Sequence, residues 1–471
     1  MDRRARTRAG TALALVAALV AGCGEPAGDD SVVDAASAGL SSVTFRLWDE
    51  AAADAYRESF DAFNAIHRDI FVEVEVVPRK GYAERVASDL AAGTMADIFW
   101  TTSDAVAAHA HGGDLLALGE VLGEDVEPWE ATVTDLYTRD GELWAVPQVW
   151  DATVLFYNTD LVAEAGVDPT ALTWDPAAVA EPAAPAAGDD TDPQEPAPEA
   201  AEQPVAAAAA PADTLRAAVR ALTRDTAGRA ATEDGFDAGA VAEHGINTDL
   251  TAPAVWLTYL AQLGGAPRAG TDLDLAGPEG QATFGYLAAL PVVPTDPESV
   301  PARELFAAGR LALFQSTSAD MRYLAEHAEV EWAVAPVPAG PEGAVSVVDG
   351  VGAAANAATD DPEATAEVLR WLASSDGQSA LASHGVGVPA AAGAQELFLR
   401  AWADRGVDAA AALAVDRAVT AAGGPQVDAA LEAVRPVLAQ TLHGGAEVGP
   451  TLVTAQRTAE ATLGSGTPKT P

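Results

Sequence analysis

The chain has 471 residues, of which 70 are acidic and 26 are basic, so its formal net charge at neutral pH is −44. This charge excludes the ordinary mode of nucleic-acid binding, because contacts with phosphates need a positively charged surface. Its simplest interpretation is a solvated surface that keeps the protein soluble, and it also makes neutral or cationic solutes easier ligands than anions. Hydrophobic residues make up 49% of the chain, which is enough for two cores at this length.

The N-terminus has the pattern of an export signal. Arginines precede an apolar run over residues 11–22, which is too short to span a bilayer as a helix. The run leads into LVAGC at residues 19–23, which resembles the lipobox of bacterial lipoproteins and implies cleavage after residue 22 and diacylation of Cys23. Cys23 is the only cysteine, so it forms no internal disulfide; the alternative is a buried small residue inside an ordinary secretory signal. We expect an exported protein, anchored by lipid to the outer face of the cytoplasmic membrane, with a flexible tether over residues 23–40.

Strands and helices alternate after the tether. Residues 43–48 and 71–77 show the period of strands, and aromatic residues at helical spacing cover 54–67 between them. A second helix is predicted over 82–92 and a third, short strand over 96–100. This alternation favours a parallel α/β sheet, in which ligands bind at the carboxyl ends of the strands. The residues directly after each strand are therefore candidates for a binding site.

An ordered set of motifs resembles a known family. The motifs are WD at 48–49, GYAERVASDLAAGTMADIFW at 81–100, GDLLAL at 113–118, GELWAVP at 141–147 and LFYNTDL at 155–161. Their order resembles the extracellular solute-binding family 1 of ABC importers, the group that includes maltose- and other sugar-binding proteins. The resemblance continues, with fewer matches, to residue 463. It implies a periplasmic-binding-protein-like fold of type II: two α/β lobes joined by a hinge, with a central ligand cleft.

We expect lobe 1 to comprise residues 41–150 and 349–395, and lobe 2 to comprise residues 151–348 and 396–471. The chain crosses between them near residues 150–151 and again in the glycine-containing segment VSVVDGVG at 345–352. A helix is expected to open at Thr173, as it does in the family.

An insertion interrupts that helix. Residues 177–212 are almost entirely Ala, Pro, Glu, Asp and Gly, a composition that predicts disorder. The insertion is either a passive surface loop or a contact with the transporter or the cell wall.

Tryptophan and aspartate dominate the candidate ligand residues. A sugar offers apolar C–H faces and a rim of hydroxyls, which flat aromatic rings and carboxylates bind. The candidates follow predicted strands, lie at the crossings or are aromatic residues of predicted helices: Trp48, Asp49, Tyr82, Trp100, Thr102, Ser103, Asp104, Trp150, Asp151, Trp256 and Asp349. Resemblance to maltose-binding members places Trp48, Trp100 and Asp151 among the ligand-facing positions.

Each candidate also has a purely structural alternative. Trp100 could end a buried strand, with the residues after it capping the next helix, and Asp151 could serve as a hydrogen-bonding residue of the hinge. Tyr82 and Trp256 lie at helical spacings that are common in cores. One departure from the family is clear: maltose-type members carry a stacking tryptophan after the position of Phe314, whereas this chain reads QSTSADM at 315–321. This departure argues against a maltodextrin ligand.

The predicted function is that of a substrate-binding lipoprotein of an ABC importer. It would act as a monomer without a cofactor, capture a mono- or oligosaccharide by hinge closure and deliver it to the permease subunits. A polar or cationic non-sugar solute, such as a polyamine, is an alternative within the same class.

An enzyme is disfavoured by the motifs that the chain lacks. The sequence has no Gly-x-Ser-x-Gly, no phosphate-cradling glycine loop and no cysteine nucleophile. His109, His111 and Asp114 lie on a glycine-containing turn, which makes a metal site there a weak hypothesis. An exported glycoside hydrolase remains open, because paired carboxylates in a sugar cleft can support hydrolysis, as does a surface scaffold without a ligand.

Overall fold

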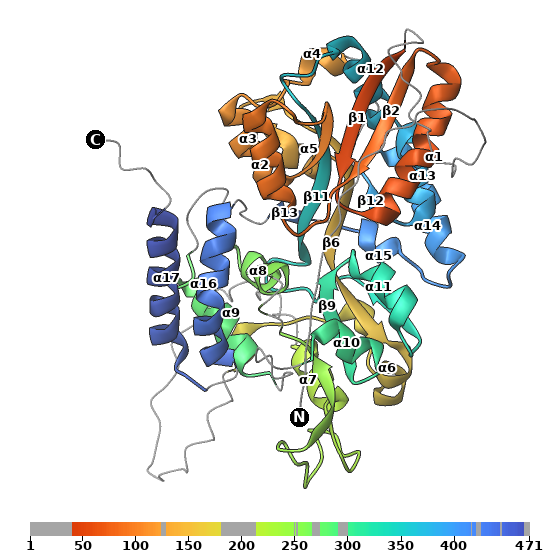
Figure 1. Ribbon diagram of the computed structural model, residues 1–471. Helices are drawn as coiled ribbons and strands as arrows, with labels where there is room; N and C mark the ends of the chain where they lie inside the picture. Colours follow the sequence, from red (N-terminus) through yellow and green to blue (C-terminus); the bar gives the residue numbers. More distant parts are fainter. Residues whose placement is uncertain are drawn as a thin grey trace, which may run out of the picture.

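Figure 1 shows the computed structural model of the chain. It describes residues 40–465 except 124–128, 180–212, 249, 251–252, 266–273, 291–299, 416, 421–424 and 443–444. The predicted signal peptide, Cys23, nearly all of the tether and most of the predicted insertion lie outside the described residues. No helix in the described part has both the length and the apolar character needed to cross a membrane.

The first lobe is a parallel sheet covered by helices. Strand β1 lies between β2 and β3, and its buried side chains pack on α1, where the ring of Phe45 lies 4.5 Å from that of Tyr56. Helix α1 begins earlier than the aromatic spacing predicted, because the Asp49 carboxylate accepts a hydrogen bond from the Ala52 amide and caps it. The main elements are β1 (Ser41–Leu47), α1 (Glu50–Ile66), β2 (Ile70–Val76), α2 (Tyr82–Ala92), β3 (Ile98–Thr102), α3 (Ser103–Gly112), α4 (Gly119–Leu122), α5 (Ala131–Tyr137), β4 (Thr138–Arg139), β5 (Glu142–Leu143), α12 (Pro362–Ala373) and α13 (Ser375–His384).

Two long strands connect this lobe to the second one. Strand β6 (Val146–Asn158) pairs with β11 (Val345–Ala355) in its first half and with β9 and β10 in its second half. The sheet therefore runs continuously in the order β2-β1-β3-β11-β6-β9-β8-β7, with the two lobes above and below the crossing in Figure 1. The predicted crossings at 150–151 and 345–352 fall on these two strands.

The second lobe is a mixed sheet with helices around it. Its elements are α6 (Thr159–Ala165), η2 (Pro169–Ala171), η3 (Pro176–Val179), α7 (Thr214–Leu222), β7 (Arg224–Asp225), β8 (Val241–Ile246), α8 (Pro253–Ala261), α9 (Pro278–Ala288), α10 (Ala302–Ala307), β9 (Leu311–Thr317), α11 (Asp320–His327), β10 (Trp332–Ala335), α16 (Pro425–Leu442) and α17 (Val448–Ser465). Helices α16 and α17 pack on each other and on α9 and close one side of the lobe. A separate hydrophobic cluster, which includes Trp256 and Phe284, fills this lobe.

The C-terminal part of the chain returns to the crossing before it reaches α16. It forms β12 (Val388–Pro389), η4 (Ala392–Ala394), α14 (Gln395–Ala403), α15 (Ala410–Leu413) and β13 (Arg417–Thr420). Helix α14 packs against α13 and β12 on the side of the first lobe, although our boundary at residue 395 assigns it to the second. The lobe boundaries themselves stay a prediction.

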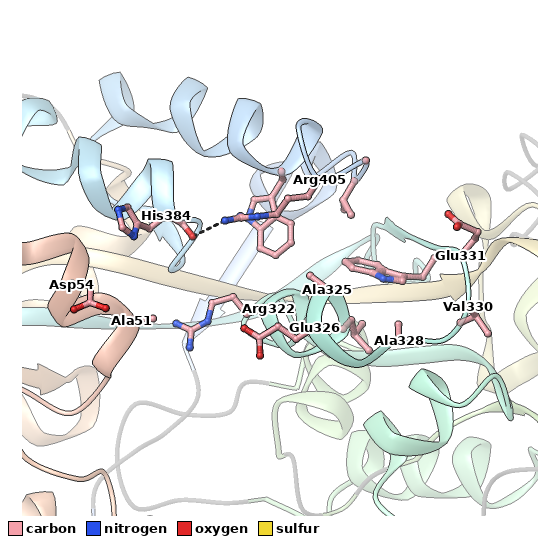
Figure 2. Close-up of a pocket in the computed structure, with 15 residues that line it drawn as sticks. Ala51, Asp54, Arg322, Ala325, Glu326, Ala328, Val330, Glu331, His384 and Arg405 are labelled. Carbon is pink, nitrogen blue, oxygen red and sulfur yellow. Dashed lines mark hydrogen bonds between the residues drawn. The ribbon is translucent and has the colours of Figure 1, made fainter. Parts of the chain in front are cut away.

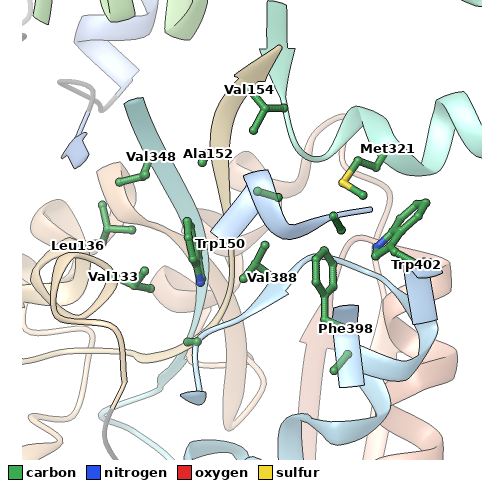
Figure 3. Close-up of a cluster of buried hydrophobic side chains, with 14 of the residues drawn as sticks. Val133, Leu136, Trp150, Ala152, Val154, Met321, Val348, Val388, Phe398 and Trp402 are labelled. Carbon is green, nitrogen blue, oxygen red and sulfur yellow. The ribbon is translucent and has the colours of Figure 1, made fainter. Parts of the chain in front are cut away.

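A hydrophobic cluster surrounds the crossing. Figure 3 shows Trp150 beside Leu136 and Val348, with Phe398 and Trp402 of α14 on the other side of β12. The cluster continues into both lobes, so the crossing strands are buried where they bend from one lobe to the other. The two lobes are therefore joined at the crossing through a closely packed hydrophobic core.

The expected helix does not begin at Thr173 itself; a 3-10 turn, η3, begins three residues later at Pro176. Thr173 forms an isolated bridge with Ala339, and Trp174 is fully buried against the rings of Tyr259 and Tyr286. The extended backbone here places the indole in the core, which a helical turn at Thr173 would not do. The next α-helix, α7, begins at Thr214, where the Asp213 carboxylate accepts a hydrogen bond from the amide of Arg216.

The two ends of the predicted insertion meet at α7. The amide of Leu215 donates to the Thr173 carbonyl at 2.9 Å, and the amide of Thr173 donates to Thr214 Oγ1 at 2.8 Å. The residues that flank the predicted insertion therefore lie side by side, and the entropy of closing a loop between them grows only slowly with its length.

Candidate functional site

A cavity of about 520 Å³ lies between the lobes at the crossing of β6 and β11. We call it the cleft. Its wall in the first lobe contains Trp48, Asp49, Arg79, Trp100 and Thr102, and its wall in the second lobe contains Arg303, Asp320, Arg322, Tyr323 and Glu326. The crossing strands form the floor with Val149, Asp151, Asp349, Gly350 and Val351.

Tryptophans form the aromatic part of the first wall. The rings of Trp48 and Trp100 meet edge to face, with centroids 4.9 Å apart. Trp100 is 2% exposed, and its indole Nε1–H donates to the Tyr56 hydroxyl at 3.0 Å, whereas Trp48 is only half-buried. Trp100 therefore supports Trp48, which presents the larger aromatic surface to the cleft.

Asp49 links the two walls. Its carboxylate caps α1 and also lies 3.2 Å from the guanidinium of Arg322 on α11. The two partners are partly exposed, at 28% for the Asp49 side chain and 35% for that of Arg322. This ion pair joins the lobes directly across the cleft.

Two aspartates face each other on the floor. Asp151 and Asp349 are directly opposite in the antiparallel pairing of β6 with β11, an arrangement that is unfavourable for like charges. Ser318 donates to Asp151 Oδ1 at 3.0 Å, and Ser103 donates to Asp349 Oδ1 at 2.7 Å. Both carboxylates line the floor of the cleft, and each is held by one serine.

Burial governs the acidity of this pair. It raises the pKa of Asp151 to about 6, against the lowering effect of the hydrogen bond from Ser318, and the charge of Asp349 raises it further. Burial also raises the pKa of Asp349, whereas the hydrogen bond from Ser103 and the Gly350 amide lower it. A ligand that donates hydrogen bonds to these carboxylates would favour their charged forms and lower both pKa values.

The residues after β3 take different roles. Thr102 lines the cleft, and its hydroxyl donates to the carboxylate of Asp104. Ser103 begins α3 and orients Asp349. Ser103 and Asp104 therefore do not line the cleft themselves, but form hydrogen bonds with residues that do.

Three further predicted residues do not line the cleft. The buried hydroxyl of Tyr82 donates to the Trp100 carbonyl at 3.0 Å, so its role is to hold β3. Trp150 packs in the hydrophobic cluster at the crossing (Figure 3). Alternate residues of a strand face opposite sides, and its neighbours Val149 and Asp151 line the cleft. Trp256 is packed in the core of the second lobe with its ring 5.6 Å from that of Phe284. We leave these three out of the proposed site.

Comparison with known proteins identifies the family. Residues 48–379 match the bacterial extracellular solute-binding protein family. The chain belongs to this family. The sequence resemblance is thereby confirmed, and the family consists of binding proteins exported from the cell.

Solved structures share the whole fold. UspC of M. tuberculosis is 36% identical with a TM-score of 0.73, and the match covers 89% of this chain and 100% of that one. The cyclic alpha-maltosyl-1,6-maltose binding protein of Arthrobacter globiformis is 20% identical with a TM-score of 0.69, covering 91% and 100% of the two chains. MalE of Listeria monocytogenes in complex with maltose is 16% identical with a TM-score of 0.66, covering 91% and 99%. A comparison with curated protein sequences gives no significant match. The predicted type II fold, with two lobes and a central cleft, is confirmed.

Sequence reasoning missed the arginines of this solute-binding cleft. The guanidinium of Arg79 lies 4.2 Å from the centre of the Trp48 ring, and that of Arg303 lies 4.6 Å from the centre of the Tyr323 ring. Arg79 follows β2 at its carboxyl end, which is a signal that could have identified it. Arg322 and Tyr323 lie just beyond QSTSADM, the segment that departs from the maltose-type pattern.

No metal centre is apparent in the described part of the chain, where no three His, Cys, Asp or Glu side chains converge as metal ligands. His109 Nδ1 lies 3.3 Å from Asp114 Oδ2 at the end of α3, which is a local pair.

Proposed function

We propose that this protein binds a carbohydrate between its lobes and delivers it to the permease of an ABC importer. The observation that carries the proposal is the cleft itself, in which a half-buried tryptophan faces carboxylates and guanidiniums. Trp48 offers apolar surface for a sugar ring, and Asp49, Asp151 and Asp349 accept hydrogen bonds from hydroxyls. Structures with the same fold are described in complex with cycloalternan and with maltose, which supports a carbohydrate ligand.

The proposed mechanism is closure of the lobes around the ligand. Each wall belongs to a different lobe, so a ligand contacts both walls only when they approach each other. Such a ligand stabilises the closed form by the contacts that exist only there. The permease then recognises the closed form. We also propose that the protein is a monomer and that Cys23 carries the lipid that holds it at the membrane.

A thermal-shift screen over mono- and oligosaccharides, followed by calorimetry of each hit, tests the proposal. Trp48→Ala and Asp151→Asn should each weaken binding of a hit by roughly 10- to 100-fold, because each loses about 1.5–3 kcal/mol of contact. Trp371→Ala and Asp168→Asn are matched controls, since Trp371 is half-buried away from the cleft and Asp168 caps the short helix η2. A hit whose affinity is unaffected by both cleft substitutions would contradict the site.

The same screen separates the alternatives. The facing carboxylates of Asp151 and Asp349 favour a cationic solute as the second candidate, and putrescine and spermidine belong in the panel for that reason. Chromatography of each hit after prolonged incubation detects hydrolysis. We expect unchanged sugar, because the protein would bind its ligand without cleaving it; product formation would make it a glycoside hydrolase.

A further inference from the structure

A second cavity of about 590 Å³ adjoins the cleft on the side of α1 and α11. We call it the side chamber. Figure 2 shows its walls: Ala51 and Asp54 come from α1, Ala325 comes from α11, and Arg405 and His384 lie above. It is as large as the cleft and lies wholly among described residues.

The two cavities meet at Arg322. Arg322 and Glu326 line both of them, whereas Asp49 lines only the cleft and Ala51 only the side chamber. In Figure 2 the Arg322 guanidinium extends from α11 toward Ala51. The Arg322–Asp49 ion pair, at 3.2 Å, therefore stands at the boundary between the two cavities. Because both partners are partly exposed, solvent screens the pair and it is easily broken.

The side chamber has the same chemistry as the cleft. The half-buried indole of Trp332 lines it, with its ring 5.8 Å from that of Phe156 behind it. Asp54 and Glu331 supply acceptors, and Arg405 and His384 supply donors. Aromatic surface surrounded by fixed polar groups is suited to a further sugar unit.

We propose that the side chamber is an extension of the ligand site, which takes the outer units of an oligosaccharide whose first units occupy the cleft. The inference rests on the proposed carbohydrate function and deepens it, since it names an oligosaccharide as the ligand class. The Arg322–Asp49 pair acts as a gate: it closes the passage when the ligand is short and opens when a longer chain passes between α1 and α11.

The test measures how affinity depends on chain length. The ligands are the α-1,4-linked and the β-1,4-linked glucans from the dimer to the hexamer, and calorimetry gives Kd for each. We expect affinity in one series to rise by at least about fivefold beyond the shortest binding member. Ala325→Trp fills the side chamber from α11, and it should abolish this increase while the shortest ligand keeps its Kd within about twofold.

Two further variants make the result decisive. Ala325→Ser leaves the space open and should behave as the wild type does. Ala51→Phe fills the chamber from the opposite wall, so the test does not depend on the folding of one variant. Both alanines are exposed and line only the side chamber.

The failures are distinguishable. If affinity does not change with length, or if Ala325→Trp and Ala51→Phe weaken short and long ligands equally, the side chamber holds no sugar and the inference is wrong. If neither these glucans nor the wider sugar panel bind to the wild-type protein, the proposed carbohydrate function itself fails.

Discussion

The two walls of the cleft are built differently. On the first wall, Trp100 is buried, hydrogen-bonded to Tyr56 and supported by Tyr82, so the wall exists before any ligand arrives. On the second wall, Arg322 and Tyr323 lie half-buried on α11 and contact their surroundings through an ion pair and stacked rings. The difference indicates that the first lobe supplies a rigid platform, whereas the second lobe supplies side chains that can rearrange when the lobes close.

The largest expected effect comes from removing the buried tryptophan side chain that supports the first wall. Trp100→Ala should lower the free energy of unfolding by about 3–5 kcal/mol, because it removes a buried indole and leaves a cavity beside Tyr56. Urea denaturation of the ligand-free protein measures the change. Trp48→Ala serves as the comparison and should cost clearly less, since Trp48 is half-buried. Equal losses for the two variants would contradict the distinction between support and contact surface.

The floor carries the next effect, which depends on pH. The folded-state pKa of Asp151 is raised to about 6 from 3.8, so folding favours its protonated form. Ionisation of Asp151 therefore lowers the free energy of unfolding. This loss of stability is absent well below pH 4, grows as the pH rises from 4 to 6 and is complete above that range. Asp151→Asn removes this loss and should raise the free energy of unfolding at pH 8 by roughly 1–3 kcal/mol.

The measurement compares wild type and Asp151→Asn by denaturation at pH 8 and pH 4. The advantage of the variant should be several-fold smaller at pH 4, where the wild-type carboxyl is protonated in the folded state and about half protonated in the unfolded state. An advantage of the same size at both pH values would show that the charge on Asp151 is not its cause.

A third prediction concerns the close contact between β11, one of the crossing strands, and α5 of the first lobe. A methyl group on Gly352 would lie 2.8 Å from the Tyr137 ring and 2.9 Å from Ala145 Cβ. Gly352→Ala should therefore destabilise the protein by about 1–3 kcal/mol through overpacking. Gly285→Ala in α9 is the control, because nothing lies within 4 Å of its added methyl group, and it should stabilise the helix by up to about 1 kcal/mol. Thermal unfolding of both variants tests the contrast in sign.

The smallest effect is expected on the second wall. Arg322→Gln removes the only ion pair that the structure shows between α11 and Asp49, and it should shift the balance toward separated lobes by about 1 kcal/mol or less. Small-angle scattering of the ligand-free protein should show a slightly larger radius of gyration. High salt should move the wild type in the same direction, because screening weakens a partly exposed pair. A radius unaffected by the substitution and by salt would exclude a role for the pair in holding the lobes.

Much of the architecture was predictable from local pattern. The strand and helix periods up to Trp100 were correct, because each of these elements buries one face and shows that face in its sequence. The same rule placed Trp48, Asp49 and Thr102 at the carboxyl edge of the first lobe, where the structure brings them to the cleft. Local pattern misplaced the start of the helical turn after Thr173, which begins only at Pro176, beyond the residues that set Trp174 into the core.

The geometry of the floor was harder to predict from the sequence. Asp151 and Asp349 are far apart in the chain, and only the register of β6 with β11 sets them opposite each other. Trp150 looked as suitable as Asp151 in the sequence, yet strand alternation allows only one of two neighbours to face the cleft. The packing of the crossing strands decides that Asp151, and not Trp150, faces the cleft.

The sequence by itself determined the order of elements, the family and the residue types at the strand ends, since these depend on neighbours along the chain. The meeting of Asp49 with Arg322, the facing aspartates and the side chamber were decided only in the tertiary structure. Each of these three features joins residues of different lobes. The distance between those residues depends on how the two lobes pack around the crossing strands.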